Sequence, residues 1–451
     1  RMSILNSLGL FSSLNLGRRA VQSQTAGLQI TGRNIANVNT PGYTRQVAIT
    51  GVTDTRADAV TGESFPSVQL IRDEVTERLL LQERGRHGSL ERQANLLSLV
   101  ETAFNEPSDS GLNAVMTAFF NSAEDLANTP ESAGARRLLI ERGGALAVTF
   151  QSLTGTLETV RNSNVEEARL IINDLNLKLT SVATLNAEIA RTSDQGSIGE
   201  LQTRQNQIIN ELAESLSIRT TTADNGVRKV SVNGLGVVDG TSAAAISMAL
   251  DADLMISLNI TLDNDTIALH PSGGSLAGLM DAQNETIPSI SNDIHSVARS
   301  IVDGVNALHP GFFADLTDPG QRARAGAFMS VQITDADSIV TSTTGLSGGN
   351  DIPLAISALR DASLVDLGNT SVLGYYRELV SGVGARVAEM DHRRDTSDLV
   401  LSQLEQRREA ISGVSLDEEA ANMIMFQRSF QAAASYINVV DNLLETLISR
   451  F

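Results

Sequence analysis

Hydrophobic residues recur with a helical spacing at the end of the chain. Counting back from the C-terminus, every third or fourth position is apolar without interruption over the last 29 residues. This seam consists of Met423, Phe426, Phe430, Ala433, Ile437, Val440, Leu444, Leu447 and Phe451. An alternating three-and-four spacing predicts a helix with a coiled-coil seam. Residues 416–451 contain no glycine or proline, and Ser415 and Glu418 have capping-box spacing, so we expect the helix to begin near Leu416.

A second apolar stripe occupies the N-terminal region. Leu14, Val21, Leu28 and Ile35 are spaced by seven residues, which predicts a helix that packs along one face. Glycines at positions 9, 17, 27 and 32 interrupt this segment. Each glycine costs a helix about 1 kcal/mol relative to alanine. We therefore expect this helix to be marginal alone and to become ordered when it packs.

Between these ends, the pattern predicts long amphipathic helices and one β-rich segment. We expect helices over residues 74–104, 111–127, 131–161, 168–189, 201–216, 287–308 and 372–409. Residues 218–270 are rich in Thr, Val and Ile, and they contain Asn-Gly and Asp-Gly pairs. Those pairs are the strongest short signal for β-hairpins. Residues 309–350 are expected to form a long loop.

The patterns together predict a mainly α protein with a small inserted β domain. The N- and C-terminal helices are expected to pair as a coiled coil, with a long helical bundle in the middle. We expect a terminal coiled-coil assembly domain of residues 2–55 and 412–451 and a helical core domain of residues 56–217 and 271–411. Residues 218–270 would form a β-rich outer domain.

The composition argues against several classes of function. A net charge of −19 disfavours binding to nucleic acid or to anionic membranes, and the absence of cysteine excludes disulfides and thiolate metal sites. The five histidines are scattered, and aromatic residues make up 4% of the chain, which is low for an enzyme pocket. We therefore predict no catalytic residues, no cofactor and no metal site. No apolar run is long enough to span a membrane, and the N-terminus does not resemble a cleaved signal peptide.

A polar turn follows the N-terminal stripe. Its key positions are Asn34, Ala36, Asn37, Thr40, Gly42 and Tyr43. Asparagine and threonine side chains hydrogen-bond to the backbone where a helix ends, proline at position 41 stops the helix, and glycine at position 42 permits a positive φ. Tyr43 can then clamp the chain as it leaves the turn. Taken alone, this motif is compatible with an ordinary helix stop.

The turn and the C-terminal seam together resemble the axial proteins of the bacterial flagellum. The N-x-A-N-x-x-T-x-G-Y element at 34–43 is similar to a signature shared by rod, hook and hook-associated proteins. Residues 412–424 are similar to the hook-associated members, whereas rod and hook proteins tend to have Ser-Asn-Val there. Residues 305–311 and 356–361 also match that branch. Residues 427–430 depart from its usual pattern, and the short β region suggests that an outer variable domain is missing.

The resemblance implies a structural protein that joins hook to filament by axial self-assembly. Such proteins are exported unfolded through the flagellar type III apparatus, so the expected location is extracellular, at the hook–filament junction. Expected partners are copies of the chain in a ring, the hook protein below, a second junction protein above and a cytosolic export chaperone on the C-terminal helix. Neither nucleic acid nor a membrane is expected as a partner.

The residues expected at the assembly interface are apolar positions of the two terminal stripes. They are Leu14, Val21, Leu28, Ile35, Met423, Phe426, Phe430, Ile437, Val440, Leu444, Leu447 and Phe451. Two alternatives remain open. Another axial rod or hook subunit would share both ends of the chain. A cytosolic coiled-coil scaffold or signalling protein would explain the seam and the acidity, but it would not explain the turn at 34–43.

Overall fold

A computed structural model describes residues 2–40, 42–49, 67–192, 195–223, 226–262 and 265–449. The contacts of the chain group it into two compact units. Unit 1 comprises residues 1–84, 176–245 and 399–451, and unit 2 comprises residues 85–175 and 246–398. The predicted β segment is therefore shared between the units, with the division after residue 245. The expected organisation into three domains stays a prediction.

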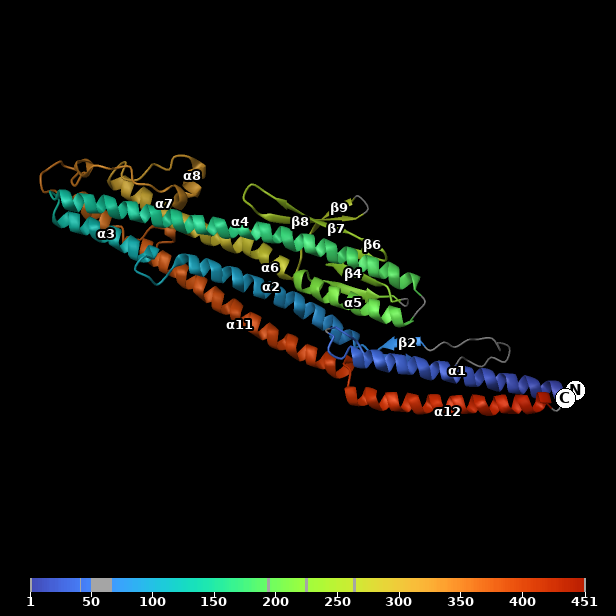
Figure 1. The fold of residues 1–451 in the computed structure, drawn as a ribbon. Helices are drawn as coiled ribbons and strands as arrows, with labels where there is room; N and C mark the ends of the chain where they lie inside the picture. Colours follow the sequence, from blue (N-terminus) through green and yellow to red (C-terminus); the bar gives the residue numbers. More distant parts are fainter. Residues whose placement is uncertain are drawn as a thin grey trace. The chain divides into compact units, whose positions relative to one another are not determined.

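Helices form most of the described chain (Figure 1). The long ones are α1 (Met2–Ala36), α2 (Glu74–Phe104), α3 (Leu112–Asn128), α4 (Ala133–Arg191), α5 (Gln195–Ser215), α7 (Ile287–Leu308), α11 (Val372–Ser412) and α12 (Leu416–Ser449). The short ones are α6 (Ser275–Asp281), α8 (Pro319–Ala323), α9 (Ala325–Phe328), α10 (Asp351–Ala358), the π-helix η1 (Ala282–Thr286), and the 3-10 helices η2 (Ala336–Ser338) and η3 (Val365–Leu367). Long helices at both ends and a small β region confirm the predicted fold class.

Two expectations about the helices were wrong. The segments expected at 131–161 and 168–189 form one helix, α4, because its buried face continues without a break through Leu157, Val165 and Ala168. Burial of this face outweighs the low helix propensity of the intervening Asn and Ser residues. The expected loop at 309–350 contains the short helices α8, α9 and η2. Phe312 and Phe313 near its start are fully buried, which anchors this segment in the core.

Aromatic side chains lie at the centre of unit 2. Phe119 of α3 contacts three other rings, with ring centroids 5.3 Å from Phe120, 6.0 Å from Phe312 and 5.9 Å from Phe313. All four side chains are fully buried, as is Tyr376 of α11. Buried apolar residues of α2, α3, α4, α7, α10 and α11 surround this group. Unit 2 therefore contains a continuous hydrophobic core.

The strands form three small sheets. β1 (Gln46–Ile49) pairs with β2 (Ser67–Leu70), and both are antiparallel. The second sheet, in unit 1, has the order β3 (Arg219–Thr222), β4 (Arg228–Val232), β5 (Leu235–Asp239) and β6 (Ser242–Ala243). The third has the order β7 (Ala245–Leu250), β8 (Ile256–Leu262) and β9 (Asp265–Leu269). Asn233 and Gly234, which join β4 to β5, have φ values of 49° and 86°, as a tight hairpin requires.

Four helical asparagines hold extended segments in the same way. In each case the side-chain NH₂ donates to a backbone carbonyl and the side-chain oxygen accepts the N–H of the same residue. The pairs are Asn34 with Gln46, Asn186 with Arg228, Asn284 with Ile256, and Asn306 with Phe313, at donor–acceptor distances of 2.7 to 3.1 Å. The amide side chain offers one N–H donor and one oxygen acceptor, as the backbone of a neighbouring strand would. Three of the four pairs dock a β-strand onto a helix.

Candidate assembly interface

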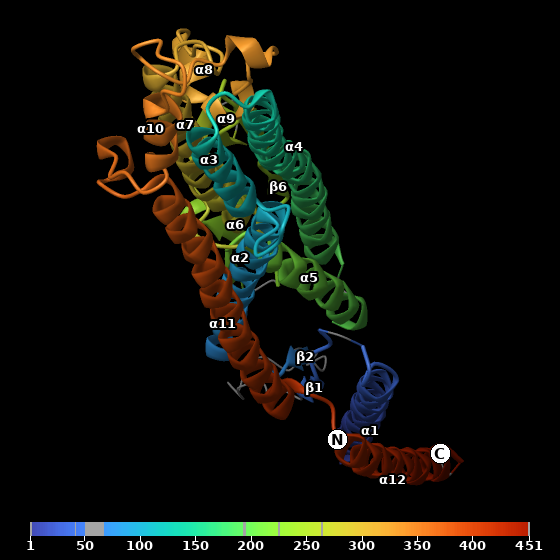
Figure 2. The same ribbon diagram turned by 90° about the vertical axis from the view of Figure 1, so that its left-hand side faces the viewer.

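The two ends of the chain form an antiparallel pair of helices. Figures 1 and 2 show α1 and α12 side by side, with both termini at the same end of the pair. A Cβ placed on Gly17 would lie 2.6 Å from Cγ1 of Ile437, and one placed on Gly27 would lie 2.6 Å from Cε1 of Phe426. Residue numbers therefore rise along α1 as they fall along α12. The predicted pairing of the terminal helices is confirmed.

The glycines of α1 have a packing role that sequence reasoning missed. Both Gly17 and Gly27 are buried, and each leaves room for a large side chain of α12. Without a Cβ the two helix backbones can approach closely. The two glycines lower the helix propensity of α1, but they allow α1 to pack closely against α12. The glycines of α1 and the large apolar residues of the seam are both visible in the sequence. Which glycine lies opposite which seam residue can be seen only when the register of the two helices is known.

The residues predicted at the assembly interface are buried to different degrees. Val440 is buried, whereas Phe430 is 36% exposed. The other predicted interface residues whose side chains are described are half-buried, namely Leu14, Val21, Leu28 and Ile35 of α1 and Met423, Phe426, Ile437 and Leu444 of α12. The side chain of Leu447 and the whole of Phe451 lie outside the described residues. Assignment of these positions to an interface between copies stays a prediction.

The polar turn folds around Asn34. This side chain is 1% exposed, and its Oδ1 accepts hydrogen bonds from Tyr43 Oη at 2.9 Å and from the Gln46 N–H at 3.1 Å. Its Nδ2 donates to the Gln46 carbonyl. Burial raises the pKa of Tyr43 to about 12, so the hydroxyl remains a donor at neutral pH. Asn34 therefore fixes the path by which the chain leaves α1.

The remaining motif residues support the same turn. Asn37 donates to the Arg33 carbonyl, and Thr40 donates to Asn37 Oδ1. Gly42 has a φ of 77°, in the left-handed region that glycine adopts without strain. Ala36 ends α1 and is exposed. Position 41 lies outside the described residues.

Arg45 connects this turn to the start of α12, a link that the sequence reasoning missed. Its Nε contacts Glu419 Oε1 at 2.8 Å and its Nη1 contacts Glu418 Oε2 at 2.6 Å. The Arg45 N–H also donates to the Ser412 carbonyl at the end of α11. Glu419 is 2% exposed, so its carboxylate depends on this arginine for compensation. The turn and the first turn of α12 are held as one structure.

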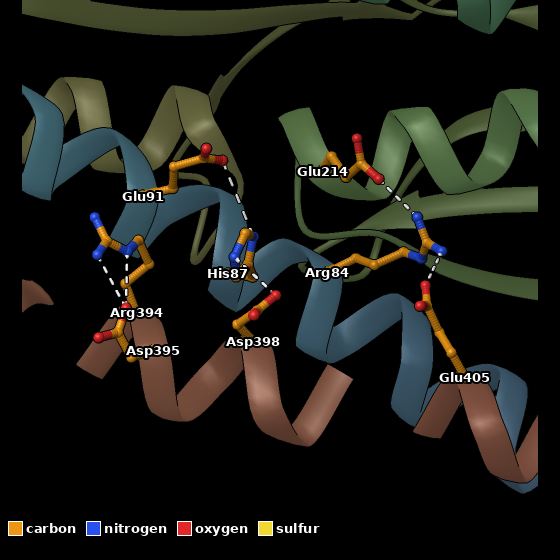
Figure 3. Close-up of polar contacts among 8 residues, drawn as sticks. All are labelled: Arg84, His87, Glu91, Glu214, Arg394, Asp395, Asp398 and Glu405. Carbon is orange, nitrogen blue, oxygen red and sulfur yellow. Dashed lines mark hydrogen bonds and ion pairs between the residues drawn. The ribbon is translucent and has the colours of Figure 1, made fainter. Parts of the chain in front are cut away.

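Other ion pairs of the two units tie helices together. In unit 1, Arg84 of α2 bridges Glu214 of α5 and Glu405 of α11, each at 2.6 Å (Figure 3). In unit 2, His87 of α2 lies 4.0 Å from Glu91 and 3.9 Å from Asp398, beyond hydrogen-bond distance. Their arrangement fits a structural role better than a chemical one.

Within the described ranges, no group of three or more His, Cys, Asp or Glu side chains is placed to hold a metal ion. The described helices likewise include none that is long and apolar enough to cross a membrane. The notable surface is instead on α12. Met425, Tyr436, Val439 and Leu443 are exposed by 52, 41, 57 and 51%. Apolar exposure repeated along one helix is typical of a surface that binds a partner.

Comparison with known families matches both the middle and the end of the chain. A family model described as the flagellar hook-associated protein FlgK helical domain matches residues 97–321. A second model, described as the flagellar basal body rod FlgEFG protein C-terminal, matches residues 405–450. The first match covers much of unit 2, and the second covers α12.

Curated relatives match the chain over nearly its whole length. Flagellar hook-associated protein 1 of Bacillus subtilis (strain 168) is 28% identical, over 97% of this chain and 98% of that protein. The protein of the same name from Escherichia coli (strain K12) is 21% identical, over 97% of this chain and 99% of that one. The latter alignment extends over 547 positions, more than the 451 residues of this chain. The Escherichia coli relative therefore contains segments that this chain lacks.

A solved structure has the same fold. The flagellar hook junction protein FlgK from Burkholderia pseudomallei superposes with a TM-score of 0.66 and 12% sequence identity. The match covers 74% of this chain and 100% of that one. At this identity the likeness concerns the fold alone.

Proposed function

The chain belongs to the family of flagellar hook-associated proteins, and we propose on this premise that it is a structural subunit that joins the flagellar hook to the filament. The observation that carries the proposal is the terminal helix pair. Arg45 forms ion pairs with the first turn of α12 in this pair, and a row of large apolar side chains on α12 remains exposed. An exposed apolar row of this kind marks a surface that binds a partner.

Assembly in the flagellum implies several partners. We propose that copies of the chain form a ring, with the hook protein below and a second junction protein above. A cytosolic chaperone would cover α12 before export through the flagellar type III apparatus, and the assembled protein would lie outside the cell at the junction. The chain is proposed to act without catalysis. A rod or hook subunit is disfavoured, because the match at 97–321 is to the hook-associated helical domain.

A charge in the seam tests the proposal. Ile437 packs against Gly17, so Ile437→Asp would bury a carboxylate between the terminal helices at a cost of several kcal/mol. The cost recurs in every copy of the ring. In a host that lacks its own junction protein, we expect this variant to be secreted and to leave hooks without filaments. Electron microscopy and the protein content of the medium measure both outcomes.

Asn438→Asp is the matched control, because Asn438 is the exposed neighbour of Ile437. It adds the same charge outside the seam, and filaments should attach. The thermal melt of unit 2 should be the same for both variants. Normal filaments with Ile437→Asp, or a large drop in the melting temperature of unit 2, would contradict the proposed role of the seam.

A further inference from the structure

Two histidines of unit 2 accept hydrogen bonds from one segment of the chain. His295 lies within α7, and its Nδ1 accepts the Gly326 N–H of α9 at 3.3 Å. His309 directly follows α7, and its Nε2 accepts the Val340 N–H at 2.9 Å. Both side chains are buried, with exposed fractions of 7% and 4%. Each ring thus holds one part of residues 323–341, which contain α9 and η2 and which we call the strap.

These two hydrogen bonds exist only while the imidazole rings are neutral. A neutral imidazole has one bare nitrogen that accepts a hydrogen bond, whereas the charged ring carries a proton on both nitrogens. On protonation, each backbone N–H of the strap would face another N–H group instead of a lone pair. Acid therefore converts both contacts from attraction to repulsion.

The surroundings of His295 oppose a charge on its ring. Burial is the largest effect and lowers the pKa of His295 from 6.5 to about 4, and Arg324 and Arg299 act in the same direction. Glu158 of α4 raises this pKa in part, but its carboxylate forms an ion pair with Arg324. Nε2 of the ring lies 3.3 Å from Ser291 Oγ, an uncharged group that accepts the proton of the neutral ring. Protonation of His295 is therefore costly as long as the strap is in place.

The surroundings of His309 act in the same direction. Burial is the largest effect and lowers the pKa of His309, while backbone groups of His309 and Pro310 raise it to a smaller extent. The ring packs edge-to-face against Phe312, with ring centroids 6.0 Å apart. The acidic residues at η2, Asp335 and Asp337, are exposed. Water weakens the field of exposed carboxylates, so they compensate a charge on His309 only slightly.

The middle of the strap is held by bonds that do not depend on acid. The carbonyl of Ser330 accepts the Ala314 N–H at 2.8 Å, and the Gln332 N–H donates to the Phe312 carbonyl at 2.9 Å. Backbone carbonyls do not change their protonation between neutral and mildly acidic pH. The strap therefore has a fixed middle, with one histidine contact on either side of it.

We propose that His295 and His309 form a pH-sensitive switch, in which protonation of both rings lets the two ends of the strap open. The opened ends would uncover Met329 and Ile339, which are buried in the closed form, and would thereby add apolar surface to unit 2. In the open form the rings lie in water, where the pKa of histidine is about 6.5. The stability of the closed form is thus fully present above pH 6.5 and is lost as pH falls toward 4. The switch is independent of the proposed junction role, which rests on the terminal helices.

Hydrogen exchange of single amides in the full chain tests the switch. Exchange is measured at pH 7 and 4.5 by mass spectrometry with fragmentation to single residues, and each rate is divided by the intrinsic rate at that pH. With a pKa of about 4 in the closed form and 6.5 in the open form, opening at Gly326 should be roughly 50-fold more frequent at pH 4.5 than at pH 7. Val340 should change in the same direction, and Gln332 should change little. Low concentrations of urea should not alter exchange at Gly326, because a local opening exposes little surface.

Substitutions assign the effect to each ring. His295→Gln keeps an acceptor but cannot be protonated, so protection at Gly326 should become independent of pH while Val340 still responds. His309→Gln should have the reverse effect. The comparison of Gly326, Val340 and Gln332 in the unsubstituted chain decides the question even if a variant does not fold.

Three results would overturn the switch. The first is unchanged protection at Gly326 and Val340 at pH 4.5. The second is an equal loss at Gln332, which would mean that the strap does not open at its ends alone. The third is exchange at Gly326 that rises with urea as steeply as exchange in α3, because acid would then unfold unit 2 as a whole.

Discussion

The terminal helix pair of unit 1 and the helical core of unit 2 are both bundles of long helices, but they bury their apolar residues differently. In unit 2, Phe119, Phe312 and Tyr376 are completely enclosed by the chain itself. In the pair, Val440 is buried, while Tyr436 and Leu443 are about half exposed. The core therefore completes its packing within one molecule. The pair leaves one side of each helix without a partner, which suits a segment that becomes fully packed only in an assembly.

The difference extends to what holds each region. Unit 2 depends on a continuous hydrophobic core of aromatic and aliphatic side chains. The pair depends on two glycine contacts, a few buried side chains such as Ile30 and Val440, several half-buried ones and the ion pairs of Arg45. Apolar burial contributes about 25 cal/mol per Å², so the core should be much the more stable of the two. Four experiments test this difference in stability between the two regions.

The largest effect is expected from a cavity in the core of unit 2. Phe119→Ala would remove a ring that contacts three others, at a cost of about 3–5 kcal/mol. Urea unfolding followed by circular dichroism should show a lower midpoint for unit 2. Leu170→Ala is the control, because Leu170 is 69% exposed and should change the midpoint little. Equal effects of the two variants would contradict the assignment of the core.

Acid should weaken unit 2 through a buried histidine. Nδ1 of His295 accepts the Gly326 N–H at 3.3 Å, and burial lowers the pKa of His295 from 6.5 to about 4. The folded state thus binds this proton less readily than the unfolded state. The stability associated with neutral His295 is fully present above pH 6.5 and is lost as pH falls toward 4, by about 3 kcal/mol.

Unfolding of unit 2 in urea at pH 7, 5 and 4 measures this loss. His295→Gln keeps an acceptor but cannot be protonated, so its stability should fall less with acid. Residues 1–50 and 412–451 contain no histidine, so we expect no corresponding loss of protection from hydrogen exchange in α1 and α12 between pH 6.5 and 4. An identical pH dependence in His295→Gln would argue against the buried histidine as the cause.

The link between the turn and α12 should have an intermediate effect. Arg45→Met would leave the carboxylate of Glu419 buried without its partner, at a cost of about 1–3 kcal/mol. Hydrogen exchange should then be faster in the first turns of α12 and unchanged in unit 2. Glu418→Gln removes the other half of the link, but this side chain is 61% exposed and its loss should be small. Comparable changes from the two variants would show that burial of Glu419 is not what matters.

The elements of both regions could be predicted from the sequence where one local pattern decides them. α12 begins at Leu416, directly after Ser415, whose Oγ lies 3.5 Å from the Glu418 N–H, as the capping box indicates. α2 and α7 span the expected residues because their apolar spacing is regular. The continuity of α4 could not be predicted, since it depends on a surface supplied by distant segments. The π-helix η1 gave no local signal either.

The candidate interface was predictable as a pattern but not as a set of contacts. The seam was found because its spacing is visible in one segment. Arg45 with Glu419 was not found, because the two residues are 374 positions apart and neither is unusual locally. The glycines of α1 were interpreted only as a loss of helix propensity. Their role depends on which residues of α12 lie opposite, and that register is set in three dimensions.

The smallest effects on stability are expected from alanine substitutions at two glycines of α1, and the two substitutions should act in opposite directions. At Gly27 an added Cβ would lie 2.6 to 2.8 Å from three ring atoms of Phe426, so Gly27→Ala would force the helices apart. Overpacking costs about 1–3 kcal/mol, which exceeds the roughly 1 kcal/mol of helix propensity that alanine adds. At Gly32 no atom lies within 4 Å of the added Cβ, so Gly32→Ala should stabilise α1 by up to about 1 kcal/mol. Amide hydrogen exchange across α1 should therefore be faster in the first variant and slower in the second. Protection that rises in both would mean that α1 is limited by its own helix propensity and that the Phe426 contact contributes little to the pair.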